Sequence, residues 1–225
     1  MIKELFSLAL LALMTTSAWA QENYTKTSEL AQEKHVKISI NAGLKGNSAL
    51  GGLAGVDVHI PFGQSRWGFE PGLYWSFRNH GSEKTVNSTK QEYSTKAHYL
   101  DIPLRFTVDV AGSKDGPFYM SVLMGPYLAY GLSGTSHSTT TIDGQVTKSE
   151  VNAFSSEGRL KSRFDYGINM GANAIIKQHF KVGIFTEIGF RDIYRPMDDV
   201  EDLLGTVFAI TKINIGAGIT VGYQF

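Results

Sequence analysis

The chain has 225 residues, the length of one domain, and is 42% hydrophobic, 12% aromatic and 19% charged. Its 21 Lys and Arg residues balance 21 Asp and Glu residues, so no long-range field attracts polyanions and we expect no nucleic-acid partner. The absence of cysteine excludes disulfides, thiolate metal sites, thiol catalysis and lipoprotein acylation.

The first twenty residues have the pattern of a secretory signal peptide. Lys3 precedes an apolar run from Leu5 to Met14, and an A-x-A cleavage pattern follows it. The residues at the cleavage position are Ala18, Ala20 and Gln21. We expect residues 1–20 to be a signal peptide, with a buried helix as the alternative, and residues 21–34 to be a polar periplasmic lead-in to a domain over 35–225. No later stretch has about 20 uninterrupted apolar residues, so a membrane location would need strands.

Eight later segments alternate between apolar and other residues, which is the period of a β-strand. In the cleanest one, from Ile213 to Phe225, every second residue is apolar, and no helix keeps two such sets on separate faces. The segments are residues 35–44, 53–62, 67–78, 97–110, 117–132, 163–176, 180–192 and 211–225. We predict an all-β fold, an eight-stranded antiparallel up-and-down β-barrel.

Alternation alone is equally compatible with a soluble barrel whose apolar face points inward. Side-chain size favours the opposite orientation, because the polar face carries the glycines, the apolar face carries bulky residues such as Trp67, Trp75 and Phe106, and eight strands enclose little space. Apart from Asp192, the last residue of its segment, the apolar face also carries no charged residue, as a lipid-facing surface requires. Its aromatic residues gather at the two ends of the strands, as interfacial girdles do. We therefore predict a transmembrane barrel in the outer membrane, surrounded by lipid and lipopolysaccharide.

The connections between the segments differ in length on the two sides of the barrel. The short ones are residues 63–66, 111–116 and 177–179, and the longer ones are 45–52, 79–96, 133–162 and 193–210. Short turns on one side and long loops on the other are typical of outer-membrane barrels, with the long loops facing outward. The last three are long enough to need a functional or disordered interpretation.

The C-terminus resembles the signal by which the barrel assembly machinery recognises bacterial outer-membrane proteins. The chain ends on an aromatic residue with apolar residues at every second position before it. The residues of this assembly signal are Val221, Tyr223 and Phe225. The assembly machinery is therefore an expected partner.

One tract resembles a known family. Residues His98 to Phe106 read H-Y-L-D-I-P-L-R-F, which is similar to the Y-L-[DE]-I-P-L strand of PorT-type outer-membrane barrels of Bacteroidetes. Phe69–Leu73 and Gly125–Tyr127 are similar to that family too, and the resemblance spans about residues 35–225. It implies an eight-stranded barrel with a signal peptide, and the family's named member takes part in protein secretion and gliding. That activity does not follow from the fold alone.

The inward face of such a barrel would carry charges of both signs, which should pair in a narrow space rather than stand alone. The predicted lumen network is Asp57, Glu70, Arg78, Asp101, Arg105, Asp109, Asp165, Lys181, Glu187, Arg191 and Lys212. If the third and fourth strands pair symmetrically about their loop, Glu70 lies opposite Arg105 and Tyr74 opposite Asp101. We expect a filled lumen, not a pore. Three prolines within strands, at positions 71, 103 and 126, each remove a ladder donor and predict bulges or breaks.

Catalysis has two candidate groups of residues. They are Ser136, His137 and Ser138 with Asp143 or Glu150, and His98 with Asp101. A triad needs a base held within hydrogen-bond reach of the nucleophile, and adjacency in a Ser/Thr-rich segment does not establish that. We expect no enzyme activity.

Metal and cofactor motifs are weak. The histidines have no H-x-H or H-E-x-x-H spacing, and no phosphate-binding glycine fingerprint precedes a helix. An acidic group near the end of the chain could hold a divalent cation through oxygen ligands, but a solvated loop explains it as well. Its residues are Asp198, Asp199, Glu201 and Asp202. We expect no cofactor and no metal.

Several functional classes remain open at this point. We favour a non-enzymatic envelope component, either structural or part of a secretion or adhesion assembly, that contacts an envelope or secretion protein through its outward loops. The alternatives are a small outer-membrane enzyme acting on lipid A or phospholipid, a narrow solute pore, and a soluble lipocalin-like barrel.

Overall fold

The computed structural model describes residues 36–46, 49–63, 65–86, 89–113, 116–142, 145–191, 193 and 214–225. The expected signal peptide with its cleavage residues Ala18, Ala20 and Gln21, and the lead-in 21–34, lie outside the described residues. Among the described residues, no helix is long and apolar enough to cross a bilayer.

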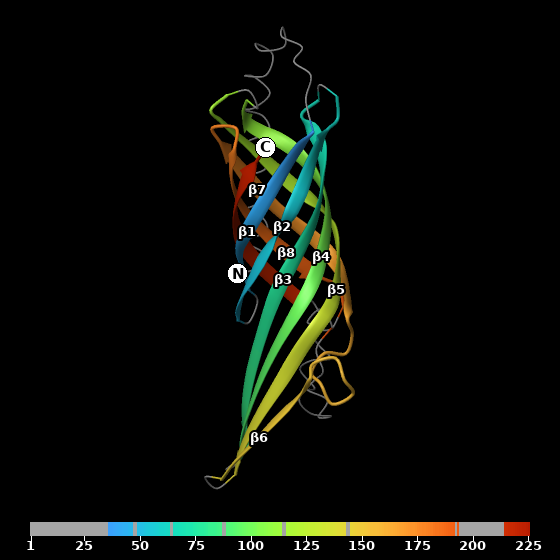
Figure 1. The fold of residues 1–225 in the computed structure, drawn as a ribbon, viewed down its shortest axis with the longest axis vertical. Helices are drawn as coiled ribbons and strands as arrows, with labels where there is room; N and C mark the ends of the chain where they lie inside the picture. Colours follow the sequence, from blue (N-terminus) through green and yellow to red (C-terminus); the bar gives the residue numbers. More distant parts are fainter. Residues whose placement is uncertain are drawn as a thin grey trace, which may run out of the picture.

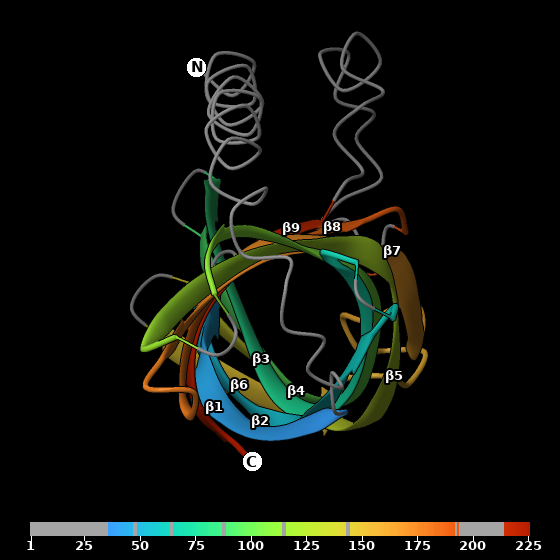
Figure 2. The ribbon, with the colours of Figure 1, turned by 90° about the horizontal axis from the view of Figure 1, so that it is seen from above.

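The described chain is built of nine strands. They are β1 (Lys37–Gly46), β2 (Leu50–Pro61), β3 (Trp67–Val86), β4 (Thr89–Gly112), β5 (Phe118–Ile142), β6 (Gln145–Asn152), β7 (Phe164–Ile176), β8 (Phe180–Gly189) and β9 (Asn214–Gln224). Eight of them close into an antiparallel ring, in which β1 pairs with β9 and β4 pairs with β5 (Figure 2). β6 stands outside the ring and pairs with β5. The predicted all-β barrel is confirmed, and its eight ring strands correspond to the eight predicted segments.

Two long hairpins project from one end of the barrel, which we call the hairpin end (Figure 1). β3 and β4 stay paired as far as Val86 and Thr89, and β5 pairs with β6 as far as Ile142 and Gln145. The expectation of long loops over 79–96 and 133–162 was therefore wrong for most of both ranges. Both segments are rich in Ser, Thr and charged residues, so they lack the apolar alternation by which a strand is recognised.

The opposite end of the barrel, which we call the turn end, has short connections as predicted. β7 and β8 are joined by Lys177–His179, in which Lys177 and Gln178 have φ angles of 52° and 65°. Positive φ at two consecutive residues is typical of the tight turns whose twist matches that of a hairpin.

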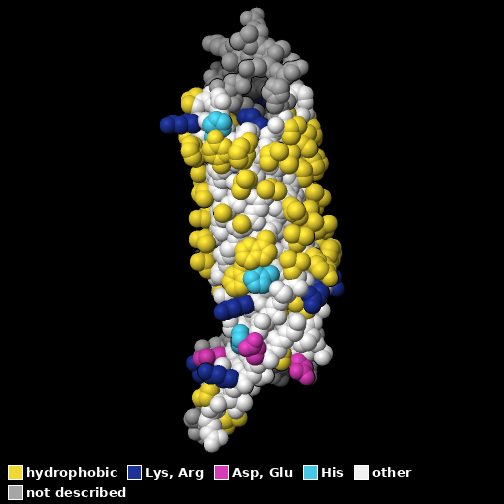
Figure 3. Space-filling view, viewed as in Figure 1, with side chains coloured by type: hydrophobic (Ala, Val, Ile, Leu, Met, Phe, Trp, Pro, Cys, Tyr) yellow, Lys and Arg dark blue, Asp and Glu magenta, His cyan; other side chains and the backbone are white. Residues whose placement is uncertain are grey.

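The two faces of the barrel differ in polarity in the predicted sense. Large apolar side chains lie on the outside, where Trp67 is 55% and Ile184 is 60% exposed, and on the face seen in Figure 3 they are spread over a broad zone of the barrel that we call the apolar band. Polar side chains face the lumen, where Ser39 and Asp165 are both 0% exposed. Because the apolar face points outward, the soluble lipocalin-like alternative is excluded.

Two bulges and several interruptions break the ladders. Register shifts occur between His98 and Tyr99 and between Asp109 and Ala111. Near the strand prolines the ladders instead lose pairs without changing register, as between Pro71 and Tyr74 on β3. The predicted breaks at prolines are therefore present, and the bulges lie elsewhere.

A small apolar cluster, which we call the hairpin-end core, lies inside the barrel wall toward the hairpin end. Residues between β6 and β7 fold back against the inner face of β4 and β5. The buried members of this core are Ala97, Tyr99, Tyr127, Ala129, Ala153 and Leu160, with Phe154 packed against them. The ring of Phe154 lies edge-on to Tyr99 at 6.0 Å, and the guanidinium of Arg163 lies 4.4 Å from the centre of that ring.

Candidate functional site

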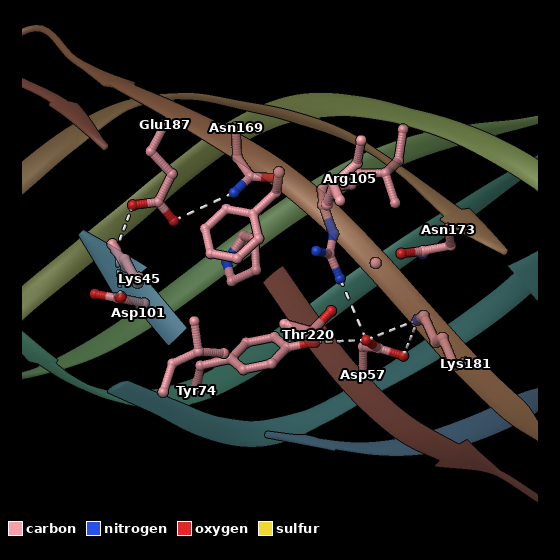
Figure 4. Close-up of a pocket in the computed structure, with 16 residues that line it drawn as sticks. Lys45, Asp57, Tyr74, Asp101, Arg105, Asn169, Asn173, Lys181, Glu187 and Thr220 are labelled. Carbon is pink, nitrogen blue, oxygen red and sulfur yellow. Dashed lines mark hydrogen bonds and ion pairs between the residues drawn. The ribbon is translucent and has the colours of Figure 1, made fainter. Parts of the chain in front are cut away.

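The lumen contains two clusters of paired charges (Figure 4). The turn-side cluster consists of Asp57, Glu70, Arg105 and Lys181, which lie toward the turn ends of β2, β3, β4 and β8. Inward-facing residues of four different strands meet there because side chains two apart along each strand share a face.

The turn-side cluster is densely bonded. Arg105 Nη2 lies 2.9 Å from Glu70 Oε1 and 3.3 Å from Asp57 Oδ2. Lys181 Nζ donates to both carboxylate oxygens of Asp57 at 2.9 Å and to Glu70 at 3.0 Å. The Tyr74 hydroxyl donates to Asp57 Oδ2 at 2.6 Å. Two acids and two bases therefore balance in charge within this cluster.

The predicted register of the third and fourth strands is confirmed in this cluster. Glu70 pairs with Arg105, and Tyr74 pairs with Asp101, across the β3–β4 ladder. The Glu70–Arg105 pair is also the ion pair described above, with both side chains under 10% exposed.

The hairpin-side cluster lies farther along the lumen. Arg78 bridges Asp101 and Asp165, with a distance of 2.8 Å to each. Lys45 pairs with Asp101 at 3.1 Å and also with Glu187. Two carboxylates of this cluster also accept hydrogen bonds from neutral side chains. Asn169 donates to Glu187 at 3.2 Å, and Tyr127 donates to Asp165 at 3.2 Å.

The hairpin-side cluster contacts the hairpin-end core through one shared residue, Arg78. The guanidinium carbon of Arg78 lies 4.2 Å from the centre of the Tyr99 ring, so one cation contributes to both groups. Between the two clusters lies a small cavity of about 30 Å³, lined by residues of both, including Asn169, Asn173 and Thr220 (Figure 4). That volume holds about two water molecules and is too small for a solute.

Most predicted lumen residues lie in these clusters, but three do not. Asp109 is half-buried near the turn end. Arg191 is exposed, so its prediction as a lumen residue was wrong, because β8 ends at Gly189 and the inward alternation ends with it. Lys212 lies outside the described residues.

One member of the hairpin-side cluster was missing from the prediction. Lys45 is 7% exposed and pairs with two carboxylates, although it was assigned to a loop. The signal was present, because Lys45 continues the inward series of Lys37, Ser39 and Asn41 at every second residue.

The assembly-signal residues lie on the outer face of β9 or just after it. Val221, Tyr223 and Phe225 are 62%, 41% and 66% exposed. Tyr223 contacts the ring of Phe225, with ring centres 4.9 Å apart, and stacks on His179 at 5.2 Å. The rings of His179, Tyr223 and Phe225 therefore form an aromatic group at the turn end.

The candidate catalytic residues are separated by the strand geometry. His137 Nδ1 lies 3.5 Å from Glu150 Oε2 on the exposed side of the β5–β6 hairpin. Ser136 points to the opposite face, where it is 3% exposed and contacts Thr95 at 3.0 Å, and Ser138 shares that face.

The second candidate pair is separated in the same way. His98 packs outside the barrel against Trp75, with ring centres 5.3 Å apart, whereas Asp101 faces the lumen. Asp143 and the acidic group from Asp198 to Asp202 lie outside the described residues. Within the described part of the chain, no group of three His, Asp or Glu residues could hold a metal ion.

Comparison with known proteins gives one family. The sequence profile described as an outer membrane protein beta-barrel domain matches residues 22–195. No curated protein matches the chain.

Several solved structures are similar at low identity. A major outer membrane protein from Thermus thermophilus is 12% identical, with 85% of this chain and 100% of that chain covered and a TM-score of 0.41. The N-terminal β-barrel domain of Pseudomonas aeruginosa OprF is 15% identical, with 86% and 100% covered and a TM-score of 0.35. The attachment invasion locus protein Ail of Yersinia pestis is 13% identical, with 86% and 100% covered and a TM-score of 0.29.

Proposed function

This chain belongs to the outer membrane protein beta-barrel domain family, and on that premise we propose that it is a non-enzymatic integral protein of the outer membrane. Its lumen is filled, and its projecting hairpins are the surface through which it acts. The carrying observation is that all nine charged groups of the two lumen clusters have an oppositely charged partner within 3.1 Å. Ions paired in this way leave no unpaired charge facing the interior, whereas a selective pore favours a ring of one sign at a constriction.

The proposed orientation places the hairpin end outside the cell and the turn end in the periplasm. Long connections on the outer side and short turns on the periplasmic side support it. Residues 1–20 are then the signal peptide that exports the chain, and Val221, Tyr223 and Phe225 form the signal for the barrel assembly machinery.

The proposed partners are an envelope, secretion or adhesion protein and the surrounding lipopolysaccharide. The β3–β4 and β5–β6 hairpins together form a four-stranded sheet, and their sequence is rich in Ser, Thr and charged residues. The His98–Phe106 tract supports a closer placement among PorT-type barrels of Bacteroidetes, which would make a secretion assembly the first partner to seek.

The test is a pull-down of the tagged protein from gently solubilised outer membrane, with heat-modifiable gel mobility as the measure of a folded barrel. Co-purification of envelope or secretion subunits, lost when the hairpins are shortened, is the expected result. A folded barrel that purifies alone would contradict a role in an assembly.

An enzyme acting on lipid A or phospholipid is the second candidate, and the 3.5 Å contact between His137 and Glu150 is the observation in its favour. Incubation of the folded barrel with labelled lipid tests it, with a His137→Ala variant as the control. A narrow pore is the third candidate, and single-channel conductance above that of protein-free bilayers would favour it over a filled lumen.

A further inference from the structure

β6 forms a free edge of the projecting sheet. Among the described residues it pairs only with β5, in a continuous register from Gln145 to Asn152 without a bulge. Seven of its eight residues are exposed and the eighth is half-buried, and none is Pro or Gly. A regular strand edge of this kind is a template for pairing with another strand.

The hydrogen bond beyond the end of β6 fixes which of its backbone groups face the free edge. Ala153 N–H donates to Gly134 C=O at 3.0 Å, so the pair 134/153 is a hydrogen-bonded pair of the β5–β6 ladder. Such pairs alternate with non-bonded pairs in an antiparallel ladder. The odd-numbered residues of β6 therefore point their N–H and C=O groups toward β5. The even-numbered residues Val146, Lys148, Glu150 and Asn152 point theirs toward the free edge.

β6 carries one basic and one acidic residue at equal distances from Ser149. Lys148 and Glu150 flank Ser149 and lie on the same face of the strand. If a second β6 pairs antiparallel about Ser149, each Lys148 lies opposite the Glu150 of the other copy, and Val146 lies opposite Asn152. Opposite charges directly across a ladder stabilise it, and like charges destabilise it.

The backbone groups and the charges together select this register. Even-numbered residues must face even-numbered residues, because both members of a hydrogen-bonded pair direct their backbone groups at each other. The two neighbouring registers that satisfy this condition place Lys148 opposite Lys148 or Glu150 opposite Glu150. We propose that the free edge of β6 binds the β6 edge of a second copy of this chain, antiparallel about Ser149.

The antiparallel pairing determines how the two barrels are oriented. β6 runs from the tip of the projection back toward the barrel (Figure 1), so antiparallel pairing makes the two projections point in opposite directions. Two barrels related in this way belong to two facing membranes. Parallel pairing within one membrane would instead stack Lys148 on Lys148 and Glu150 on Glu150.

This inference deepens the proposed function and rests on its outward orientation of the hairpin end. It names a partner, a second copy of the chain on a facing cell or vesicle, and a mode of contact, the addition of one sheet edge to another. Four even-numbered pairs with two backbone hydrogen bonds each make a small interface of low intrinsic affinity. Many copies on each membrane would raise the avidity without new contacts.

The experiment uses the full chain folded into phosphatidylcholine vesicles in two populations that carry different fluorophores. The readout is the fraction of particles that contain both colours, with heat-modifiable mobility confirming that each variant is folded. Wild-type vesicles are expected to cluster. Lys148→Glu and Glu150→Lys vesicles are each expected to cluster at least about tenfold less, because like charges then face each other across the ladder.

The most discriminating experiments combine charge-reversal variants so that opposite charges face each other again, although the sequence is not the wild-type one. Vesicles of Lys148→Glu mixed with vesicles of Glu150→Lys should cluster with each other, and the double variant should cluster with itself. Dispersed wild-type vesicles that contain folded barrels would overturn the β6 contact and leave the proposed function standing. Equal clustering by all variants would overturn it as well, whereas failure of every variant to form a heat-modifiable barrel would count against the proposed function.

Discussion

β4 passes through two surroundings, and both of its faces change polarity between them. Within the apolar band its outer residues from Leu100 to Phe106 are apolar, and its inner residues Asp101 and Arg105 are paired ions. In the projection its outer residues from Lys90 to Lys96 are polar, while the inner Tyr99 is 1% exposed in the hairpin-end core. The change occurs next to a bulge in the β4–β5 ladder.

The comparison shows that strand geometry alone does not decide which face is apolar. Alternation assigns side chains to two faces, and the surroundings of each face select their polarity. A lipid-facing surface excludes charge and moves it to the lumen, whereas a water-facing sheet needs its apolar contacts on the inside. Two kinds of substitution test this dependence on the surroundings. One adds a charge to the lipid-facing surface, and the other removes a side chain from the lumen clusters or from the hairpin-end core.

The largest effect is expected where a buried charge loses its partner. Replacing Arg105 with Ala leaves Glu70 and Asp57 with Lys181 as their main cation, and breaking such a buried network destabilises the barrel by about 3–5 kcal/mol. Urea unfolding of the barrel in lipid vesicles measures this.

A double-mutant cycle separates the ion pair from packing. Glu70→Gln and Arg105→Gln should be non-additive by about 1–3 kcal/mol, because the groups are in direct contact. Strict additivity of the two single variants would show that the pair contributes nothing of its own.

The next prediction compares an added Arg side chain on the outer face of β4 at two positions, one within the apolar band and one within the projection. Leu104→Arg introduces a cation into the apolar band and is expected to destabilise the folded barrel by about 2–4 kcal/mol. Ser94→Arg, on the same outer face within the projection, is the matched control and should change stability by about 0.5 kcal/mol or less. Equal effects of the two substitutions in vesicle unfolding would contradict the boundary between lipid and water.

A smaller and local effect is expected in the hairpin-end core. Leu160 is 2% exposed, and Leu160→Ala should favour local opening of residues 153–163 by about 2 kcal/mol through lost burial and a residual cavity. Hydrogen exchange should rise in that segment and stay unchanged in β8 and β9. A parallel rise throughout the barrel would mean that the hairpin-end core and the barrel unfold as one unit.

Much of the barrel was predictable because every strand within the apolar band alternates between apolar outward residues and polar or glycine inward residues. The absence of charge from one face, the glycines on the other and the short turns predicted the orientation of both faces. The same alternation, carried across a symmetric hairpin, predicted the pairing of Glu70 with Arg105. Gly183 illustrates why glycines occupy the inward face, since a Cβ atom there would lie 2.6 Å from Asn173 Oδ1 inside the lumen.

The remaining features depend on contacts that no local pattern encodes. Asp57 and Lys181 are 124 residues apart, so the division of the lumen charges into two clusters comes from the closed ring. The projecting strands were assigned to loops because water on the outer face removes the apolar signal from β5 beyond Leu132. Lys45 was missed for another reason, because the predicted strand was ended at residue 44 although the inward alternation continues through Lys45.

The smallest effect concerns pH at the inner face of the projection. His80 pairs with Thr95 across the β3–β4 ladder, and Thr95 contacts Ser136, which accepts a hydrogen bond from Arg159 N–H. Burial lowers the pKa of His80 below its ordinary value of 6.5, and the charge of Arg159 lowers it further. The folded projection therefore binds a proton at His80 less readily than the unfolded chain does.

The sign of the pH effect follows from this difference. Stability contributed by neutral His80 is present above the ordinary pKa and is lost as the pH falls below it, so acidification should loosen residues 153–163 against β4 and β5. Hydrogen exchange in that segment, corrected for the intrinsic pH dependence of the amide rates, should rise between about pH 7 and about pH 5.5 by less than in Leu160→Ala. A His80→Gln variant should remove this rise while leaving the lumen clusters intact. An unchanged rise in that variant would assign the pH response to another group.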